Sequence, residues 1–407
     1  MASVCQYEQT SVNRLSWRAL STKVPRAARL HVLTLTPFYP SARDDAGGCF
    51  VAEPLALLAE LGIKSTAIAA RPFYRGGRLT ANETAHPATW FRYIAPPRMT
   101  GLALSGRALY LRIRGAVQRL HSAEPLTLIH AHAALPCGQA AALLARDLGV
   151  PFVVTVHGRD VFSSRQGGFI GHWCELLCKN VYRSARCVIC VSERVQEDLR
   201  SGLHCRSSVV RNGVDTKMFS PQNSRECDEV VLSVGNLIPS KGHEALLRSL
   251  AAIRGTHPRL RCEIIGTGPE RARLAHLAQQ LGISDCVVFL GWQSRAAVAR
   301  AMQRCCLFVL PSSYEGLGCV YLEAMATGKP TVGCRRQGIA EVIKSGETGW
   351  LVEPGDTESL ANVLHQLLRD SGLRERVGMA GRRVVLENFS VQHQAERLLQ
   401  VYQECAQ

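Results

Sequence analysis

The 407-residue sequence predicts an α/β protein of two doubly wound halves that follow each other in the chain and face each other across a cleft. From residue 30 onward, short apolar runs of strand type alternate with helical patterns, which is typical of parallel sheets. A polar stretch over 220–228 interrupts this alternation near mid-chain, and it restarts at Val230. The length favours the same division, because a chain of this size is too long for one compact core.

The first half begins with a predicted strand over 30–36, a turn-rich loop, a helix over 50–61 and a strand over 63–69. Gly47 and Gly48 lie between the first strand and this helix. Glycines at such a junction permit close approach of the backbone to a phosphate, and they equally serve a tight turn.

A strongly basic segment follows and contributes much of the net charge of +15. The pattern over 102–120 predicts a helix with an apolar stripe that includes Leu109 and Ile113, and with Arg107 and Arg114 opposite. Such a helix suits either an anionic membrane surface or packing on its own domain. Nucleic acid is disfavoured, because aromatic residues are not interleaved with the basic ones. The basic residues of the segment are Arg71, Arg75, Arg78, Arg92, Arg98, Arg107, Arg112, Arg114 and Arg119.

The rest of the first half continues the alternation of strands and helices. His157 follows the strand over 151–156, so it either points into the cleft from the carboxyl end of the sheet or is a hydrogen-bonded edge histidine. Ser192 is a good N-cap for the helix over 193–200. The predicted strands are 126–130, 151–156, 187–191 and 208–211, and the predicted helices are 136–148 and 193–200.

The second half opens with a strand over 230–234, a loop, and a helix over 241–253 that we expect Ser240 to cap. Lys241 at this junction is well placed to meet a phosphate as a point charge, although an isolated lysine is more often only solvated. The following elements are a strand over 262–265 before Gly266 and Gly268, a strand over 286–290 before Gly291 and Trp292, helices over 294–303, 338–343, 357–368, 373–386 and 391–404, and a hairpin over 346–356.

The stretch from Cys305 to Gly333 reads as strand, loop, helix and strand. Glu315 lies on the loop and Glu323 lies inside the helix, so the two carboxylates are expected at different depths of one cleft. The start of the helix offers free backbone amides to an anionic ligand. Two solvated surface glutamates are the plainer alternative.

Several classes of protein are disfavoured by the sequence. No uninterrupted apolar run is long enough to cross a bilayer, and residues 1–27 mix charges without a central apolar block, which indicates a mobile extension rather than a secretory signal. The sixteen cysteines are scattered through apolar runs, as expected of a cytoplasmic protein in a reducing compartment. A zinc site is disfavoured at the nearest cluster, which is formed by Cys174, Cys178, Cys187 and Cys190.

Five motifs follow one another along the chain. The most specific is EGLGCVYLE, in which Glu315 and Glu323 form a Glu-x7-Glu element. Together they resemble the retaining glycosyltransferases of family 4, which have the GT-B fold of two Rossmann-like domains. The resemblance is strongest over 230–353 and extends more weakly from about Leu30 to the C-terminus. The other four motifs are VTVHGRD from Val154, RNGVDTKMF from Arg211, VGNLIPSKG from Val234 and IGTGP from Ile265.

The resemblance implies a role for each matching residue. Glu323 would bind the ribose hydroxyls of a nucleotide diphosphate sugar, either a UDP-sugar or a GDP-sugar, and Glu315 would hold the transferred sugar and stabilise an oxocarbenium-like transition state. Lys241 would neutralise the leaving diphosphate, so neither a metal ion nor a cofactor is expected. His157 would line the cleft near the sugar and the acceptor and complete the catalytic set. The implied donor-binding residues are Gly48, Asn236, Lys241, Gly266, Gly268, Gly291, Trp292, Gly318, Cys319, Val320 and Glu323.

One position departs from the family pattern. The family often has an arginine five positions before the lysine, where this chain has Asn236. This removes one bidentate cation from the implied phosphate site. Arg335 or Arg336 is a candidate to supply the missing charge.

The resemblance implies a retaining, metal-independent enzyme that moves a sugar from a nucleotide diphosphate sugar to a glycan or lipid-linked acceptor during assembly of a cell-surface polysaccharide or glycolipid. It would be peripheral at the inner face of the cell membrane if the basic helix binds lipid. The alternatives are an epimerase of nucleotide sugars with the same fold, and a catalytically silent scaffold that binds them. The expected domains are an acceptor-side domain over 28–219, a linker over 220–228, a donor-binding domain over 229–388, and a helix over 389–407 that crosses back to the first domain.

Overall fold

The computed structural model describes residues 30–42, 44–74, 86–96, 98–158, 160, 168–222 and 229–407. The N-terminal extension predicted over 1–27 and most of the linker predicted over 220–228 lie outside the described residues. So do Arg75 and Arg78 of the basic segment.

The first half of the chain forms a parallel sheet of seven strands within the described residues, in the order β3-β2-β1-β4-β5-β6-β7. The central strands are buried on both faces, as expected for a parallel sheet covered by helices. The strands are β1 (His31–Thr36), β2 (Lys64–Pro72), β3 (Ala88–Tyr93), β4 (Leu128–His132), β5 (Phe152–Val156), β6 (Cys187–Cys190) and β7 (Ser207–Val209).

The second half forms another parallel sheet, in the order β10-β9-β8-β11-β12-β13. In both sheets the chain starts near the middle, runs to one edge and then returns to the other side, which is the doubly wound topology. The prediction of two such halves is therefore confirmed. The strands are β8 (Val230–Val234), β9 (Arg261–Ile265), β10 (Val287–Gly291), β11 (Leu307–Val309), β12 (Thr331–Cys334) and β13 (Trp350–Val352).

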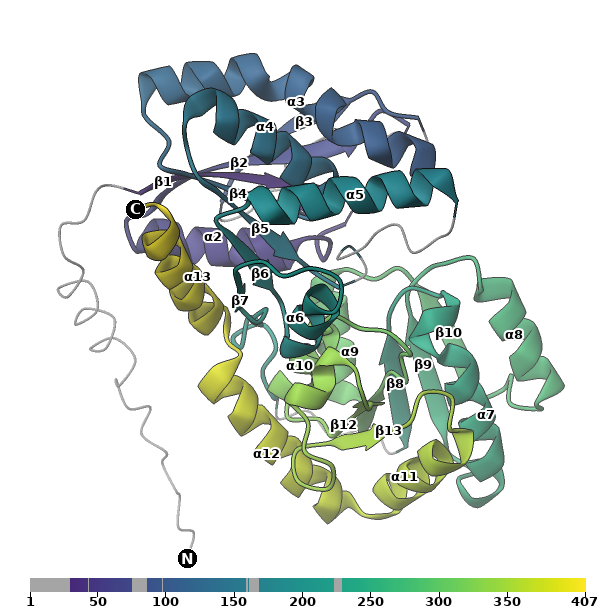
Figure 1. The fold of residues 1–407 in the computed structure, drawn as a ribbon. Helices are drawn as coiled ribbons and strands as arrows, with labels where there is room; N and C mark the ends of the chain where they lie inside the picture. Colours follow the sequence, from purple (N-terminus) through teal and green to yellow (C-terminus); the bar gives the residue numbers. More distant parts are fainter. Residues whose placement is uncertain are drawn as a thin grey trace, which may run out of the picture.

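Helices cover both faces of the first sheet (Figure 1). Helices α3, α4 and α5 pack together on one face, and α2 packs with the C-terminal helix α13 on the other. The short helix α6 follows β6 and is capped by Ser192, as predicted. The helices of this half are α2 (Cys49–Glu60), α3 (Arg98–Ala123), a π-helical turn η1 (Ala134–Gly138), α4 (Gln139–Leu148), α5 (Phe169–Ser184) and α6 (Glu193–Arg200).

The second sheet is also covered on both faces. Helices α7, α8 and α11 pack on one face, and α9, α10 and α12 pack on the other. These helices are α7 (His243–Ile253), α8 (Arg271–Gln280), α9 (Arg295–Arg304), α10 (Cys319–Ala326), α11 (Thr357–Arg369) and α12 (Ser371–Asn388), with 3-10 turns η2 (Pro239–Lys241), η3 (Arg254–Thr256) and η4 (Gly338–Glu341).

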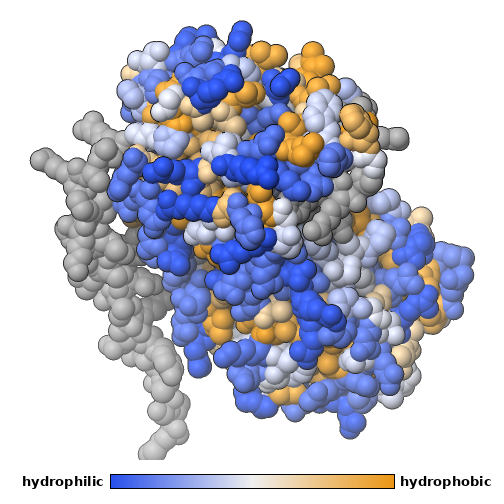
Figure 2. Space-filling model, viewed as in Figure 1, coloured by the Kyte–Doolittle hydropathy of each residue, from blue (hydrophilic) through white to orange (hydrophobic). Residues whose placement is uncertain are grey.

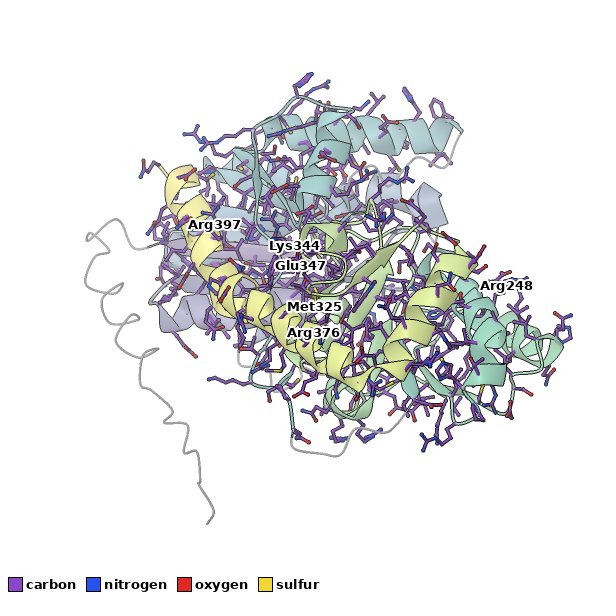
Figure 3. All side chains as sticks on the ribbon, turned by 90° about the horizontal axis from the view of Figure 1, so that it is seen from below. Arg248, Met325, Lys344, Glu347, Arg376 and Arg397 are labelled. Carbon is purple, nitrogen blue, oxygen red and sulfur yellow. The ribbon has the colours of Figure 1, made fainter. Side chains whose placement is uncertain are left out.

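The last helix, α13 (Val391–Cys405), belongs to the second half in sequence but packs on the first half. It begins at Ser390, whose hydroxyl accepts from the backbone N–H of His393. The crossing is fixed by Gly213, whose N–H donates to Gln394 Oε1 at 2.8 Å. Seen from below, α12 and α13 follow each other from one half to the other, with Arg376 on the first and Arg397 on the second (Figure 3).

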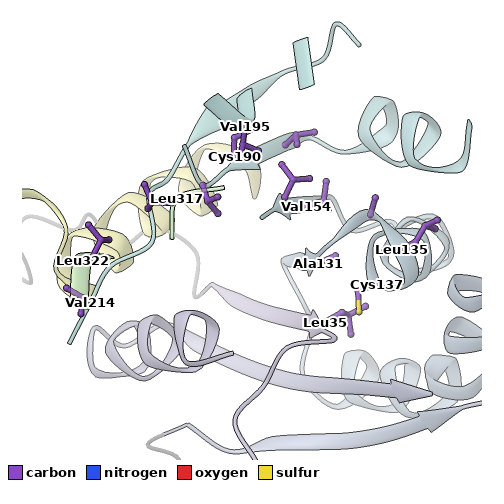
Figure 4. Close-up of a cluster of buried hydrophobic side chains, with 14 of the residues drawn as sticks. Leu35, Ala131, Leu135, Cys137, Val154, Cys190, Val195, Val214, Leu317 and Leu322 are labelled. Atoms are coloured by element: carbon purple, nitrogen blue, oxygen red, sulfur yellow. The ribbon is translucent and has the colours of Figure 1, made fainter. Parts of the chain in front are cut away.

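One hydrophobic core cluster runs through both halves. Figure 4 shows part of it, in which Val154 and Cys190 from the first sheet share a cluster with Leu317 and Leu322 from the second half. All four side chains are buried. Since apolar burial is the main favourable term in folding, this shared core holds the two halves together.

Three predicted details are wrong. The segment over 346–356 is not a hairpin, because Trp350 and Val352 are buried in β13, which pairs in parallel with β12. Ser240 does not cap α7; it lies in the turn η2, and Gly242, in a left-handed conformation, precedes the helix. Pro136 does not begin a regular helix, because it lies in the π-helical turn before α4.

The helix predicted over 102–120 is confirmed as part of the longer helix α3. Its stripe of Leu109, Ile113 and Val117 is fully buried, and α3 packs against α4, α5 and β3. The stripe therefore serves the core of its own half. Arg107 and Arg114 are exposed on the outer side. None of the described helices is both long and apolar enough to span a bilayer.

Candidate active site

The two halves touch where loops at the carboxyl ends of β5, β6 and β11 meet. Ser192 Oγ donates to the carbonyl oxygen of Gly316 at 2.6 Å, and the backbone N–H of Arg194 donates to Glu341 Oε1 at 2.8 Å. A Cβ on Gly316 would lie only 2.1 Å from the carbonyl oxygen of His157, so this approach requires glycine. The loop that carries Glu315 is thus held directly against the loop that carries His157.

Glu315 and Lys241 form an ion pair at the carboxyl end of the second sheet. Their side chains are only 13% and 19% exposed. The backbone N–H of Glu315 donates to Gln337 Oε1 at 2.9 Å, which fixes the loop, and Lys241 ends the turn η2 after β8. The structure therefore brings together two of the three predicted catalytic residues, with opposite charges in contact.

The N-terminus of α10 follows Glu315 closely in the sequence. Gly318 precedes the helix at φ 81°, a left-handed conformation that favours glycine, and no side chain of the described residues caps the helix. Cys319 and Val320 form the first turn and are half-buried. Uncapped amides at a helix start, close to a lysine, suit an anionic group.

Glu323 lies one turn further along α10, and its side chain is 13% exposed. Burial raises the pKa of Glu323 to about 7, although Arg295, with its Nε 3.8 Å from Glu323 Oε1, acts in the opposite direction. No hydrogen bond to the Glu323 carboxylate is formed by the described residues. A half-ionised carboxylate with free acceptor oxygens is suited to a ligand that donates hydroxyl hydrogens.

His157 is half-buried and lies at the end of a row of histidines in the first half, of which His130 and His132 are buried. Its Nε2 lies 3.1 Å from His132 Nδ1, and the two rings stack at 5.3 Å. His132 is followed by His130, whose Nδ1 lies 2.6 Å from the hydroxyl of Tyr402 on α13. Burial lowers the pKa of His157 to about 3, so this imidazole is neutral near pH 7. The rings of Phe38 and Phe50 cover its other sides.

The glycine motifs of the second half have a structural reason in the packing of neighbouring loops. A Cβ on Gly266 would lie 1.9 Å from the carbonyl oxygen of Gly235, and one on Gly268 would lie 2.3 Å from that of Leu237. The loop after β9 therefore rests on the loop that carries Asn236, which is exposed. The contact of Gly266, Gly268 and Asn236 with the donor stays a prediction.

The remaining predicted donor residues lie at the ends of β10 and β1. Gly291 ends β10 at φ 68°, and Trp292 next to it is 49% exposed. Gly48 precedes α2 at φ 87°, where a Cβ would lie 2.4 Å from the backbone of Phe38. Gly48 thus has a clear structural role, and its approach to a phosphate stays a prediction.

Neither arginine suggested as a replacement for the missing family cation is paired with a residue of the predicted donor site. Arg335 and Arg336 are exposed, and both form ion pairs with Glu353. Arg335 and Arg336 therefore do not replace the positive charge of the family arginine, whose position is occupied by Asn236 in this chain.

No group of three or more His, Cys, Asp or Glu side chains in the described part of the chain is arranged to hold a metal ion. Cys174 and Cys178 are buried free thiols on α5, and Cys187 and Cys190 are buried free thiols on β6.

Three residues near the predicted donor site were not anticipated. Arg295 is buried at the start of α9, and its guanidinium pairs with Glu53 on α2. Asp45 accepts a hydrogen bond from the backbone N–H of Arg295. No local pattern marks them, because their partners are distant in sequence.

Two family models match consecutive parts of the chain. The model of glycosyltransferase family 4 matches residues 51–218, and the model of glycosyl transferases group 1 matches residues 214–384. Together they span both halves and include Glu315, Glu323 and Lys241.

The chain is also similar to individual proteins. It is 30% identical to alpha-maltose-1-phosphate synthase of Mycolicibacterium smegmatis over 77% of this chain and 87% of that protein. It is 31% identical to the lipopolysaccharide core biosynthesis glycosyltransferase LpsE of Rhizobium meliloti over 54% of this chain and 65% of that protein. Its fold matches the crystal structure of HepE from Anabaena in complex with UDP and glucose, with a TM-score of 0.71, 21% identity, and 92% and 100% of the two chains covered.

Proposed function

This chain belongs to the family 4, group 1 glycosyltransferases, and we propose that it transfers a sugar from a nucleotide diphosphate sugar to an acceptor hydroxyl with retention of configuration. The observation that carries this proposal is the half-buried ion pair of Lys241 with Glu315 beside the uncapped start of α10. It places a cation, free amides and a carboxylate close together, as transfer from a diphosphate requires.

The donor would lie along the second sheet with its charged part at α10. The amides of Cys319 and Val320 would bind the diphosphate, and Lys241 would turn from Glu315 to the diphosphate when the donor enters. Glu323, whose carboxylate faces Arg295 but accepts no hydrogen bond from the described residues, would accept hydrogen bonds from the ribose hydroxyls. The crystal structure of HepE in complex with UDP and glucose supports a uridine donor as the first to be tested.

The reacting sugar would lie between the two halves. Glu315, released from Lys241, would hold the sugar hydroxyls and stabilise the positive charge that develops at the anomeric carbon. Lys241 would stabilise the negative charge on the departing diphosphate, so the transfer would need no divalent ion. His157, which is neutral and is held by His132, would line the acceptor side and offer a hydrogen bond there.

We infer an acceptor of the kind used in cell-surface polysaccharide or glycolipid assembly. The similarity to LpsE, a lipopolysaccharide core biosynthesis glycosyltransferase, supports this class. The surface of α5 also suits it, because Phe169, Trp173 and Leu176 are exposed on one face of this helix, with Phe169 85% exposed. Figure 2 shows hydrophobic residues over the region of α3 and α5. The enzyme would then act at an anionic membrane surface, with these apolar side chains rather than the buried α3 stripe meeting the lipid.

The test is an assay of the purified full-length protein with UDP-, GDP- and ADP-sugars, with and without lipid-linked acceptors. We expect acceptor-dependent release of one nucleoside diphosphate, an α-linked product from an α-linked donor by NMR, unchanged rates in EDTA, and loss of transfer in Glu315→Ala. Inversion of the anomeric carbon or loss of activity in EDTA would overturn those parts of the proposal. An altered sugar still attached to its nucleotide would identify an epimerase, and binding without turnover across the acceptor panel would identify a scaffold; the family comparisons favour neither.

A further inference from the structure

Arg295 joins the two halves of the molecule beside the proposed donor site. It is the first residue of α9, it is only 8% exposed, and its guanidinium pairs with Glu53 on α2. Its backbone N–H donates to both carboxylate oxygens of Asp45 at 3.1 Å. Asp45 and Glu53 lie on either side of the Gly47–Gly48 loop, so one residue of the second half holds both flanks of that loop.

The same guanidinium faces the second half. Its Nε lies 3.8 Å from Glu323 Oε1 and has no hydrogen-bond partner among the described residues. Its central carbon lies 5.3 Å from the ring centre of Phe219, which closes another side of the site. The charge of Arg295 is therefore shared between a carboxylate of the first half and a carboxylate of the second.

A buried guanidinium is tolerated only when carboxylates and hydrogen bonds compensate for lost solvation. Here Glu53 supplies the direct contact, and Glu323 supplies a second negative charge without a hydrogen bond. The oxygens of Glu323 therefore remain available to a ligand, while the neighbouring cation favours their ionised form.

We propose that Arg295 is a positioning residue that docks the Gly47–Gly48 loop of the first half onto the donor site and orients Glu323 for the ribose. The inference rests on the proposed function, because it assigns these contacts to a nucleotide diphosphate sugar. Arg295 does not touch the reacting atoms. It acts by placing two binding groups from different halves at one ligand.

Arg295 would also be buried if it served only to hold the two halves together. The test therefore needs a measured quantity that does not change when only stability changes. That quantity is the pH dependence of nucleotide binding, since Arg295 lowers the pKa of Glu323. The other titratable groups that face Glu323 are Glu53 and the thiols of Cys49 and Cys319. Burial raises the pKa of both thiols and of Glu53, so Arg295 is the cation that favours ionised Glu323.

The experiment measures binding of UDP and GDP to the full-length protein by calorimetry from pH 6 to pH 9. We expect Arg295→Met to weaken binding at pH 7 by roughly tenfold and to move the inflection of the binding curve to higher pH. Arg295→Lys, which keeps the charge, should restore the position of the inflection. The matched control is Arg300→Met, because Arg300 is exposed on the same helix and should bind like the wild type.

Asp45→Asn provides a second variant if Arg295→Met fails to fold, because Asp45 is only half-buried and lies on a loop. It should weaken UDP or GDP binding several-fold without moving the pH inflection, since it loosens the loop and leaves Glu323 beside Arg295. Wild-type affinity and an unchanged inflection in Arg295→Met, or wild-type affinity in Asp45→Asn, would overturn the positioning role alone. A wild-type protein that binds no nucleoside diphosphate would overturn the proposed function, and this inference with it.

Discussion

The ammonium group of Lys241 and the carboxylate of Glu315 neutralise each other at the carboxyl end of the second sheet, where both side chains are largely shielded from water. Their loops follow β8 and β11, which are neighbours in the second sheet. In the proposed reaction both groups exchange this contact for the donor, Lys241 for the diphosphate and Glu315 for the sugar. The ion pair is thus a resting arrangement that competes with the ligand.

This competition predicts opposite effects of Glu315→Gln on binding and on turnover. Without the carboxylate, Lys241 is free to meet the diphosphate, so UDP or GDP should bind roughly threefold to tenfold more tightly. The loss of negative charge beside the developing cation should lower kcat by on the order of 100-fold or more. Calorimetry and steady-state kinetics measure the two quantities separately.

Glu347→Gln serves as the control, because Glu347 is an exposed glutamate of the same half, labelled in Figure 3. It should change neither affinity nor kcat. Weaker nucleotide binding in Glu315→Gln would contradict the competition between Lys241 and the ligand.

Donor binding should depend on pH through Glu323. Its pKa of about 7 means that the carboxylate is half protonated at neutral pH, and only the ionised form accepts hydrogen bonds from both ribose hydroxyls. Affinity for UDP or GDP should therefore rise several-fold between pH 6 and pH 8. Glu323→Gln should remove this rise, and a rise that persists in that variant would assign it to another group.

The same shift affects stability with a definite sign. The folded pKa of Glu323 lies above its ordinary value of 4.5, so the folded protein binds the proton more tightly than the unfolded chain. The contribution of Glu323 to the free energy of unfolding should fall as pH rises through the window from 4.5 to about 7. Bound nucleotide, which selects the ionised form, should oppose this fall. Chemical denaturation of the wild type and Glu323→Gln across that window measures the difference.

Tyr402 ties the C-terminal helix to the row of histidines in the first half. Its hydroxyl lies 2.6 Å from His130 Nδ1, and both side chains are buried. Tyr402→Phe should lower the free energy of unfolding by about 1–3 kcal/mol, because it leaves a buried imidazole nitrogen without a partner. Tyr110→Phe, which removes a solvent-accessible hydroxyl bonded to Asp147, should cost less than about 0.5 kcal/mol. Urea denaturation compares the two, and equal losses would show that the buried bond to His130 adds nothing.

Much of the fold could be predicted because alternating strands and helices leave a regular pattern of apolar residues. The pattern failed at two short or edge strands, and it also gave no prediction of the helix α5 (Phe169–Ser184). Strand β3 (Ala88–Tyr93) was missed because only Tyr93 of its six residues is fully buried. Trp350 was assigned to a hairpin because its turn-rich neighbours hid a three-residue strand.

Some residues of the site could be predicted from local sequence patterns, and others could not because their contacts are distant in sequence. Lys241 and Glu315 stand at strand-to-helix junctions, so motif and position pointed to one cleft before the structure brought them into contact. Arg295 gave no signal, because its partners Asp45 and Glu53 lie 250 and 242 residues away. A contact of that kind depends on how the two halves meet, which no local pattern encodes.

The exposed apolar face of α5 predicts binding to anionic lipid. Phe169, Trp173 and Leu176 have the i, i+4, i+7 spacing of one helical face and together with His172 line a shallow groove. Such a surface would enter the interfacial region of a bilayer, while exposed Arg107 and Arg114 on α3 would meet the anionic headgroups. Flotation with liposomes that contain phosphatidylglycerol should therefore recover the protein, and recovery should fall with added salt.

Replacing the two aromatic residues, Phe169→Ser with Trp173→Ser, should reduce recovery by about tenfold, because each removes a large apolar surface from the interface. Arg107→Gln with Arg114→Gln should weaken binding less and reduce its dependence on salt, since headgroup attraction is worth about 1 kcal/mol for each basic residue. Met379→Ser is the matched control, because Met379 is also exposed but lies on α12 of the second half. Equal losses in Met379→Ser and the aromatic variant would indicate non-specific adhesion, and unchanged flotation of the aromatic variant would remove α5 from the lipid-binding surface.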